Sequence, residues 1–215
     1  MQEEKNYPNF SIENSYQNFV VSGFDEAGRG PIAGPVVAAC VILNQNNYPR
    51  QINDSKKISP KLRLKIFNEL QESAKFGIGI VDEKKIDEIN ILQATKLAML
   101  MAYKDLCQKY QIFPQVVLVD GNFVPFSKQD QIIEIIPVVK GDQKSLSIAA
   151  ASIIAKETRD NIMYNLHQKF PYYGWDKNAA YPTKFHVEKV KELGICEFHR
   201  KSFEPIRTLL CDANN

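Results

Sequence analysis

The sequence is poor in cysteine and has no closely spaced cysteine pair. Its 215 residues include Cys40, Cys107, Cys196 and Cys211, which lie too far apart for a CxxC zinc or redox motif. A chain of this length, with 44% hydrophobic residues, can bury enough surface to fold without disulfide bonds. We therefore expect free thiols, which are typical of a reducing compartment.

Long hydrophobic runs and an excess of one charge are also missing. Residues 1–18 are polar, which argues against a secretory signal, and no apolar run reaches the roughly 18 residues of a membrane span. We therefore expect a cytoplasmic protein that does not enter a membrane. The 27 basic and 25 acidic residues give a net charge of +2, so a nucleic-acid site would have to arise from local segregation of charge.

What the sequence does contain is a succession of strand-like and helical segments. Runs rich in β-branched residues predict strands over 19–24, 35–43, 76–81, 116–119 and 132–139. Helices are expected after the cap Ser59 and over 84–110, 146–170, 184–193 and 203–210. The first three strands could form an antiparallel meander, and later strand–helix–strand units favour parallel pairing. The prediction is an α/β fold, a mixed five-stranded sheet flanked by helices, with a small C-terminal helical appendage from about residue 184.

Four acidic side chains stand where predicted strands end. Asp25 and Glu26 close the first strand, Asp120 closes the fourth, and Asp142 follows the fifth. Each acid alone is more simply explained as a cap or turn residue. If the first and fourth strands are neighbours, however, Asp25 and Asp120 meet at one end of the sheet. Carboxylates so near to one another repel each other, and bound Mg²⁺ or Mn²⁺ would reverse this penalty. The bound ions could also activate water for phosphodiester cleavage.

A glycine- and proline-rich segment follows the first acidic pair. It begins Ala27-Gly28-Arg29-Gly30-Pro31 and ends at Gly34-Pro35. Glycine allows the backbone to approach a ligand closely, and Arg29 could bind a phosphate. Backbone groups of such a turn can also reach the ribose 2′-hydroxyl, which distinguishes RNA from DNA. A plain turn is the competing explanation.

Several short segments occur in a fixed order along the chain. They are GFDEAGRGPIAGPVVAACVIL at 23–43, DSKK at 54–57, NILQAT at 90–95, DG at 120–121, KGD at 140–142, SIAAASIIAK at 147–156, TRD at 158–160 and HRKSF at 199–203. This series resembles the motifs of ribonuclease HII, the type 2 ribonuclease H family. Only residues 1–18 lie outside the resemblance.

The resemblance implies a ribonuclease H-like fold and an endonuclease that acts with Mn²⁺ or Mg²⁺. Such an enzyme hydrolyses the RNA strand of RNA–DNA hybrids and incises 5′ to ribonucleotides embedded in duplex DNA, leaving a 3′-hydroxyl and a 5′-phosphate. By matching motif positions, the metal ligands are Asp25, Glu26 and Asp120, and Asp142 is the fourth catalytic acid. The implied substrate-binding residues are Gly28, Arg29 and Gly30 at the 2′-hydroxyl, Lys56 and Lys57 at phosphates, and Tyr181 at the sugar of the RNA–DNA junction.

The segment around Tyr181 departs from the family pattern. The family usually shows GYGT, whereas this chain reads Ala180-Tyr181-Pro182-Thr183. Alanine disfavours a positive φ, and proline fixes φ near −65° and has no N–H. The expected tyrosine contact is retained, but both replacements bear on the geometry of the loop.

Other conspicuous side chains are expected to be structural. His186 and His199 lack metal-ligand spacing, and Asp160 lies inside a predicted helix, where a salt bridge or helix packing is favoured. The aromatic segment 170–175 is expected to pack a helix end rather than stack on bases. The basic residues near the C-terminus indicate a solvated face or a duplex-binding flank, namely Lys184, Lys189, Lys191, Arg200 and Lys201.

We expect three parts of the chain: an N-terminal extension over 1–18, a catalytic domain over 19–210 and a tail over 211–215. The protein is expected to be a monomer that binds RNA–DNA hybrids and ribonucleotide-containing duplex DNA. Two alternatives stay open at this point. One is a type 3 ribonuclease H, which usually carries a further N-terminal domain, and the other is a non-catalytic nucleic-acid-binding module on the same fold.

Overall fold

The computed structural model describes residues 7–127 and 131–212. Residues 1–6 of the expected extension and 213–215 of the expected tail lie outside this part. Within it, the strands are β1 (Val21–Ala27), β2 (Val36–Leu43), β3 (Ala74–Val81), β4 (Val116–Asp120) and β5 (Glu134–Val138). The helices are α1 (Ser11–Asn14), α2 (Pro60–Ser73), α3 (Glu83–Tyr110), η1 (Gly141–Gln143), α4 (Leu146–Lys169), η2 (Pro171–Tyr173), α5 (Trp175–Asn178), α6 (Lys184–Leu193) and α7 (Ile206–Asp212).

The strands form one mixed sheet, which confirms the predicted architecture. Its order is β3-β2-β1-β4-β5. β1, β2 and β3 pair antiparallel as the expected meander, whereas β4 runs parallel to β1 and β5 runs parallel to β4. Pro137 lies in the edge strand β5, where a residue without an N–H is tolerated.

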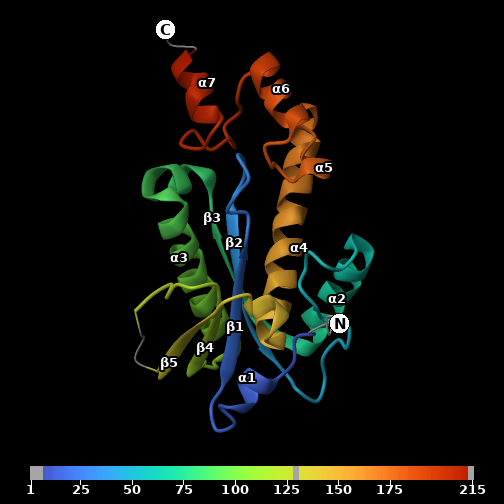
Figure 1. Cartoon of the computed structure of the whole chain (residues 1–215), viewed down its shortest axis with the longest axis vertical. Coiled ribbons are helices and arrows are strands. Elements are labelled where there is room, and N and C mark those ends of the chain that lie inside the picture. The colour runs from blue at the N-terminus through green and yellow to red at the C-terminus, as the bar shows by residue number, and fades with distance from the viewer. Residues whose placement is uncertain (1–6, 128–130, 213–215) are drawn as a thin grey trace, which may run out of the picture.

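Helices cover both faces of the sheet (Figure 1). Successive residues of a strand point to opposite faces, and β2 shows this clearly. Its Cys40 belongs to the buried cluster formed with Met99 of α3, whereas the next residue, Val41, belongs to the cluster formed with Ile153 of α4. Because both faces of β2 are covered, this strand is apolar throughout rather than alternating with polar residues.

The helix predicted over 84–110 is interrupted, so the expectation of one regular helix was wrong at Asn90. This residue has φ 66° and ψ 163° within α3. Its Oδ1 accepts hydrogen bonds from the N–H groups of Leu92 and Gln93, at 3.0 and 3.1 Å. Asparagine tolerates a positive φ and caps helices well, so Asn90 starts a new helical segment. Leu92, two residues after this break, is 39% exposed.

The short helix α1 was not predicted, and it contacts the start of α4. Glu13 is buried, and its Oε1 accepts hydrogen bonds from Ser145 Oγ at 2.7 Å and from the N–H of Ser147 at 3.0 Å. Ser145 is also the N-cap of α4, because its side chain accepts from the N–H of Ile148. Residues 7–18 therefore include buried contacts with the sheet-covering helix.

The C-terminal half of α4 extends beyond the sheet and carries α5, α6 and α7 (Figure 1). These helices form a separate buried cluster with Met163 of α4 and with Ile32 from the segment between β1 and β2. This is the predicted C-terminal helical appendage. Within residues 7–127 and 131–212, no helix has both the length and the apolar character needed to cross a membrane.

Candidate active site

The pairing of β1 with β4 brings Asp25 and Asp120 to neighbouring strand ends. Phe24 lies opposite Val119 in the parallel register, so the next residue of each strand is one of these acids. Asp25 is buried and Asp120 is partly buried. The N–H of Gly141 donates to Asp120 Oδ1 at 2.6 Å, which ties the end of β4 to the turn after β5.

That turn carries Asp142 into the same group of acids. Asp142 lies in η1 and is buried. Burial first, and then the nearby carboxylates of Asp120 and Asp54, raise the pKa of Asp142 to about 6. Asp54 was not among the predicted acids of the site. It is buried in the DSKK loop, where its Oδ1 accepts the N–H of Lys56 at 2.9 Å.

Burial and neighbouring carboxylates raise the pKa of Asp25, and the carboxylates raise the pKa of the lysine beside it. Burial, followed by the charges of Glu26 and Asp120, raises the pKa of Asp25 well above its usual range. Partial burial lowers the pKa of Lys56, but the surrounding carboxylates, Asp25 first among them, raise it above its ordinary value overall. The site therefore favours positive charge, because a cation relieves repulsion among the carboxylates.

Glu26 offers an unsatisfied oxygen to this site. Its Oε1 accepts a hydrogen bond from Arg29 Nη1 at 3.2 Å, whereas its Oε2 is buried and has no hydrogen-bond partner among the described residues. Burial raises the pKa of Glu26, and Arg29 opposes this shift. Buried polar atoms are normally paired, so an orphaned carboxylate oxygen among other carboxylates indicates a position for a cation.

The donor set fits Mg²⁺ or Mn²⁺ by its chemistry. All of its donors are carboxylate oxygens, which hard divalent cations prefer. In residues 7–127 and 131–212, no group of three or more histidine, cysteine, aspartate or glutamate side chains is placed so that it could hold a metal ion. The acids match a divalent ion in type and charge, but their side chains are not drawn together into a complete set of ligands.

A cavity of about 390 Å³ opens beside Asp25 and Glu26. The turn between β1 and β2 lies on one side, and the DSKK loop and α4 lie on another. The lining residues are Asp25, Glu26, Ala27, Gly28, Arg29, Gly30, Ser55, Lys56, Ser152, Lys156, Arg159 and Tyr181. Most of the residues predicted from the sequence thus converge on one cavity. Lys57 is exposed and is not part of its lining.

The predicted ribose contacts face Tyr181 within this cavity. Gly28 is buried, whereas Arg29 and Gly30 are exposed. A Cβ atom on Gly30 would lie 3.4 Å from the ring of Tyr181, whose side chain is 45% exposed. Ala180, just before the tyrosine, has φ 65° and is fully buried. The loop thus adopts a positive φ even though alanine disfavours it.

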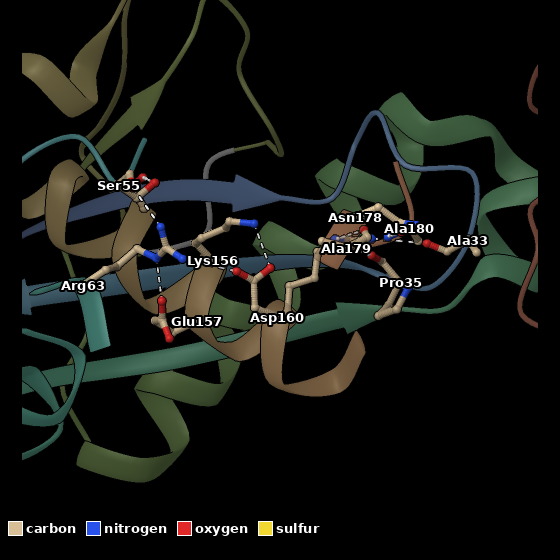
Figure 2. A network of polar contacts seen from close by, with 12 residues as sticks. Ala33, Pro35, Ser55, Arg63, Lys156, Glu157, Asp160, Asn178, Ala179 and Ala180 are labelled. Atoms are coloured by element: carbon tan, nitrogen blue, oxygen red, sulfur yellow. Dashed lines mark hydrogen bonds and ion pairs between the residues drawn. The ribbon is translucent and has the colours of Figure 1, made fainter. Parts of the chain in front are cut away.

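The structure supports the structural interpretation of several other residues. His186 and His199 are buried and contact each other through their Nε2 atoms at 3.2 Å. Asp160 forms ion pairs with Lys156 at 2.7 Å and with Arg63 at 3.4 Å (Figure 2). Of the aromatic segment, Tyr173 and Trp175 are buried in the C-terminal cluster, whereas Tyr172 is exposed.

The grouping of Arg200 with the surface bases was wrong. Its side chain is fully buried, and it donates hydrogen bonds to backbone carbonyls of the turn between β1 and β2. Arg159 has a similar role and was not singled out from the sequence at all. Both arginines lie in short motifs that were noticed, TRD and HRKSF. Their positions in those motifs gave a signal, but nothing local showed which basic residues would be buried.

Comparison with known protein families gives a consistent result. A family model described as ribonuclease HII matches residues 22–206. A ribonuclease HII of Rickettsia bellii (strain OSU 85-389) is 49% identical over 192 residues, which cover 89% of this chain and 93% of that protein.

Solved structures show the same fold. The crystal structure of ribonuclease H2 from Pyrococcus horikoshii OT3 matches with a TM-score of 0.72 and 28% identity, covering 91% of this chain and 99% of that one. Bst-RNase HIII in complex with Mn²⁺ matches with a TM-score of 0.66 and 20% identity, covering 93% of this chain and 72% of that one. The second match supports the fold alone. Together they confirm the ribonuclease H-like fold expected from the sequence.

Proposed function

Because this chain belongs to the ribonuclease HII family and is an endonuclease of the ribonuclease H type, we propose that it recognises single ribonucleotides in duplex DNA. It incises the phosphodiester 5′ to the ribonucleotide and leaves a 3′-hydroxyl and a 5′-phosphate. It also cuts the RNA strand of RNA–DNA hybrids, and it acts as a monomer in the cytoplasm. The observation that carries this proposal is the meeting of the acid pair, the glycine turn and Tyr181 in one cavity.

In this proposal the acids bind the metal and the substrate backbone together. Asp25, Glu26 and Asp120 hold Mn²⁺ or Mg²⁺, with Asp142 as the fourth acid. The bound metal supplies activation of water and stabilisation of the leaving oxygen. Lys56, in the cavity wall, offsets the charge of an adjacent phosphate, and the exposed Lys57 contacts a phosphate further along the strand.

The turn and the tyrosine provide the selection for ribose. Backbone groups of Gly28 to Gly30 contact the 2′-hydroxyl, because this part of the turn borders the cavity and two of its residues have no side chain beyond Cα. Tyr181 packs its exposed ring against the sugar at the junction. Arg29, already paired with Glu26, lies where it can meet the phosphate next to that sugar.

The two alternatives, a type 3 ribonuclease H and a non-catalytic binding module, have less support than this proposal. The family model and the 49% identical relative identify type 2, whereas the type 3 match at 20% identity shares only the fold. A binding module without catalysis would not need the acids, yet all four are present and three of them have raised pKa values.

Cleavage of a duplex with one embedded ribonucleotide tests the proposal. With Mn²⁺ or Mg²⁺ we expect a single incision on the 5′ side of the ribonucleotide and none in an all-DNA duplex. Asp120→Asn should lower the rate by about 1000-fold, because an effect of several kcal/mol on the transition state is lost. Asp176→Asn, an acid outside the site, serves as the matched control. Equal cutting of the all-DNA duplex, or full activity of Asp120→Asn, contradicts the proposal.

Metal binding can be measured without cleavage. Mn²⁺ at about 100 times its dissociation constant should stabilise the folded protein by about 2.7 kcal/mol. Its melting temperature should therefore rise with Mn²⁺ and fall back when EDTA removes the ion. Asp25→Asn should lose this rise, whereas Asp176→Asn should keep it. A rise that is the same in all three proteins would show that the metal binds elsewhere.

A further inference from the structure

Two buried arginines hold the backbone of the glycine turn from behind. Arg200 is fully buried, and its guanidinium donates to four carbonyls. Nε donates to Gly34 at 2.9 Å, Nη1 donates to Pro31 at 2.8 Å and to Arg29 at 3.2 Å, and Nη2 donates to Gly28 at 2.7 Å. One side chain thus binds four backbone carbonyls of the segment between β1 and β2.

Arg159 of α4 holds the next part of the same turn and links it to the segment before Tyr181. Its Nε donates to the carbonyl of Pro35 at 3.0 Å, and Nη2 donates to that of Ala33 at 3.2 Å. Its Nη1 donates to the carbonyl of Ala179 at 3.0 Å. Figure 2 shows Ala33, Pro35 and Ala179 close together, although Ala179 follows the other two by more than 140 positions in the sequence. The N–H of Ile32 also donates to Ala180 at 2.9 Å.

Neither guanidinium is placed there by an acid. Among the described residues, no carboxylate forms an ion pair with Arg159 or Arg200. Burial lowers the pKa of Arg159 to about 10 and that of Arg200 to about 9, so both remain charged at neutral pH. The charges of Asp87 and Glu83 favour protonated Arg200, and that of Asp160 favours protonated Arg159, but the direct hydrogen bonds of both guanidinium groups go to backbone carbonyls. Burying two charges without a direct ion pair is costly, which indicates a role beyond filling space.

The hydrogen bonds of Arg200 also fix where the amide groups of the turn point. In a trans peptide unit, the C=O of one residue and the N–H of the next point in opposite directions. Because the carbonyls of Gly28 and Arg29 point to the guanidinium, the N–H groups of Arg29 and Gly30 point away from it. Neither of these N–H groups donates to any described residue, and both residues line the cavity. They are free donors on the side where a sugar hydroxyl would bind.

Gly28 is locked to this arrangement by sterics as well. It has φ 98°, and a Cβ atom there would lie 2.2 Å from Nε of Arg159. A side chain at this position would displace the arginine before it met any ligand. The turn, the two arginines and the loop before Tyr181 therefore form one interlocked unit.

We propose that Arg159 and Arg200 are positioning residues that set the discrimination between ribose and deoxyribose, by holding the free amides of the glycine turn and Tyr181 in register. This inference rests on the proposed function. Lysine keeps the charge but presents one compact ammonium group, which cannot reach carbonyls spread around a planar fork. In Arg200→Lys and Arg159→Lys the turn should therefore be held less rigidly. Both variants should lose preference for ribose over deoxyribose, and not only activity.

The test compares how tightly the protein binds two duplexes that differ by one 2′-hydroxyl, with Mg²⁺ present in both measurements. Asp120→Asn serves as the background, so that no cleavage disturbs the measurement. In this background the ribonucleotide duplex should bind more tightly than the all-DNA duplex. Adding Arg200→Lys or Arg159→Lys should reduce the ratio of the two dissociation constants by about 10-fold, the effect of losing about 1.4 kcal/mol of preference.

Two controls separate positioning from general stability. Arg207→Lys changes an exposed arginine of α7 and should leave the ratio unchanged. Leu70→Ala removes a buried side chain of α2, on the sheet side of the molecule, and should destabilise the protein without altering the ratio. Should Arg200→Lys fail to fold, Arg159→Lys provides the same measurement. An unchanged ratio in a folded arginine variant overturns the inference, whereas equal binding of both duplexes by the background protein counts against the proposed function instead.

Discussion

Ala180 shows how a single residue can hold an unfavourable backbone conformation. Its φ of 65° lies in the left-handed region, which costs an L-residue with a Cβ roughly 1–2 kcal/mol. Hydrogen bonds on both sides fix it there: its N–H donates to Asn178 Oδ1 at 2.8 Å, and its carbonyl accepts from Ile32. The conformation is therefore imposed by the surroundings of the loop rather than chosen by the residue.

Ala180→Gly should accordingly lower the stability of the folded protein less than an alanine-to-glycine change at a buried position without backbone strain. Ala155 of α4 is also fully buried, so Ala155→Gly loses a similar methyl group but relieves no strain. We expect Ala180→Gly to leave the protein more stable than Ala155→Gly by about 1–2 kcal/mol. Urea unfolding of the two variants and the wild type measures this difference. Equal losses in both variants would mean that Ala180 carries no strain.

At the scale of elements, the close approach of α3 to the sheet depends on Gly79 of β3. A Cβ atom at this position would lie 1.9 Å from the carbonyl oxygen of Ala98 in α3. Backbone atoms cannot move aside as a flexible side chain can. The missing side chain therefore sets the distance between helix and sheet, because the helix backbone rests directly on the strand.

Gly79→Ala should push α3 away from β3. We expect the free energy of unfolding to fall by about 1–3 kcal/mol or more, as is typical of overpacking. Its stability is measured by urea unfolding, and its core packing by near-ultraviolet circular dichroism, which reports on buried aromatic residues such as Tyr103 of α3. Lys75→Ala, at an exposed position of the same strand, should change stability by less than about 0.5 kcal/mol. If Gly79→Ala unfolded at the same urea concentration as the wild type, the two backbones would not be in direct contact.

At the scale of the whole molecule, a histidine pair joins the C-terminal helices. His199 Nδ1 accepts the N–H of Cys196 at 3.0 Å, so its proton lies on Nε2, which donates to His186 Nε2. The same His186 atom accepts from Trp175 Nε1 at 3.1 Å, and His186 Nδ1 donates to the carbonyl of Tyr181 at 3.0 Å. This arrangement requires both rings to be neutral.

The neutral pair makes the stability of the folded protein depend on pH. Burial lowers the pKa of His186, and burial together with His186 lowers the pKa of His199 to about 4. Between the ordinary value near 6.5 and about 4, the unfolded chain binds a proton that the folded chain does not, so stability falls as pH falls. From pH 7 to pH 5 the loss attributable to His199 should be about 2 kcal/mol.

Urea unfolding at both pH values, with the His199→Gln variant for comparison, isolates this effect from that of the acids. Those with raised pKa values, such as Asp142, act in the opposite direction and are unchanged in the variant. The wild type should lose about 2 kcal/mol more than His199→Gln, and His167→Gln, a histidine outside the pair, should behave as the wild type. Parallel losses in the wild type and His199→Gln would exclude the mechanism.

Local patterns in the sequence predicted most of the elements of the fold. Runs of β-branched residues marked the strands within a few residues, and the acids at their ends, Asp25 and Asp120, followed from those boundaries. The interruption of α3 was missed, because Asn90 fits a helical pattern as well as a break. The short helix α1 was missed because its burial depends on Ser145 and Ser147, more than 130 residues away.

The sequence by itself determined which side chains are the candidates for chemistry. They are the four acids, the glycine turn and the tyrosine, and they were identified by their types, their places at strand ends and the resemblance of their motifs to a known family. Only the tertiary structure decided which basic residues hold that site together. Arg159 and Arg200 are buried because carbonyls of a turn more than 120 residues earlier in the chain surround them. A charge becomes buried only where distant backbone dipoles replace its water, and no local pattern records that replacement.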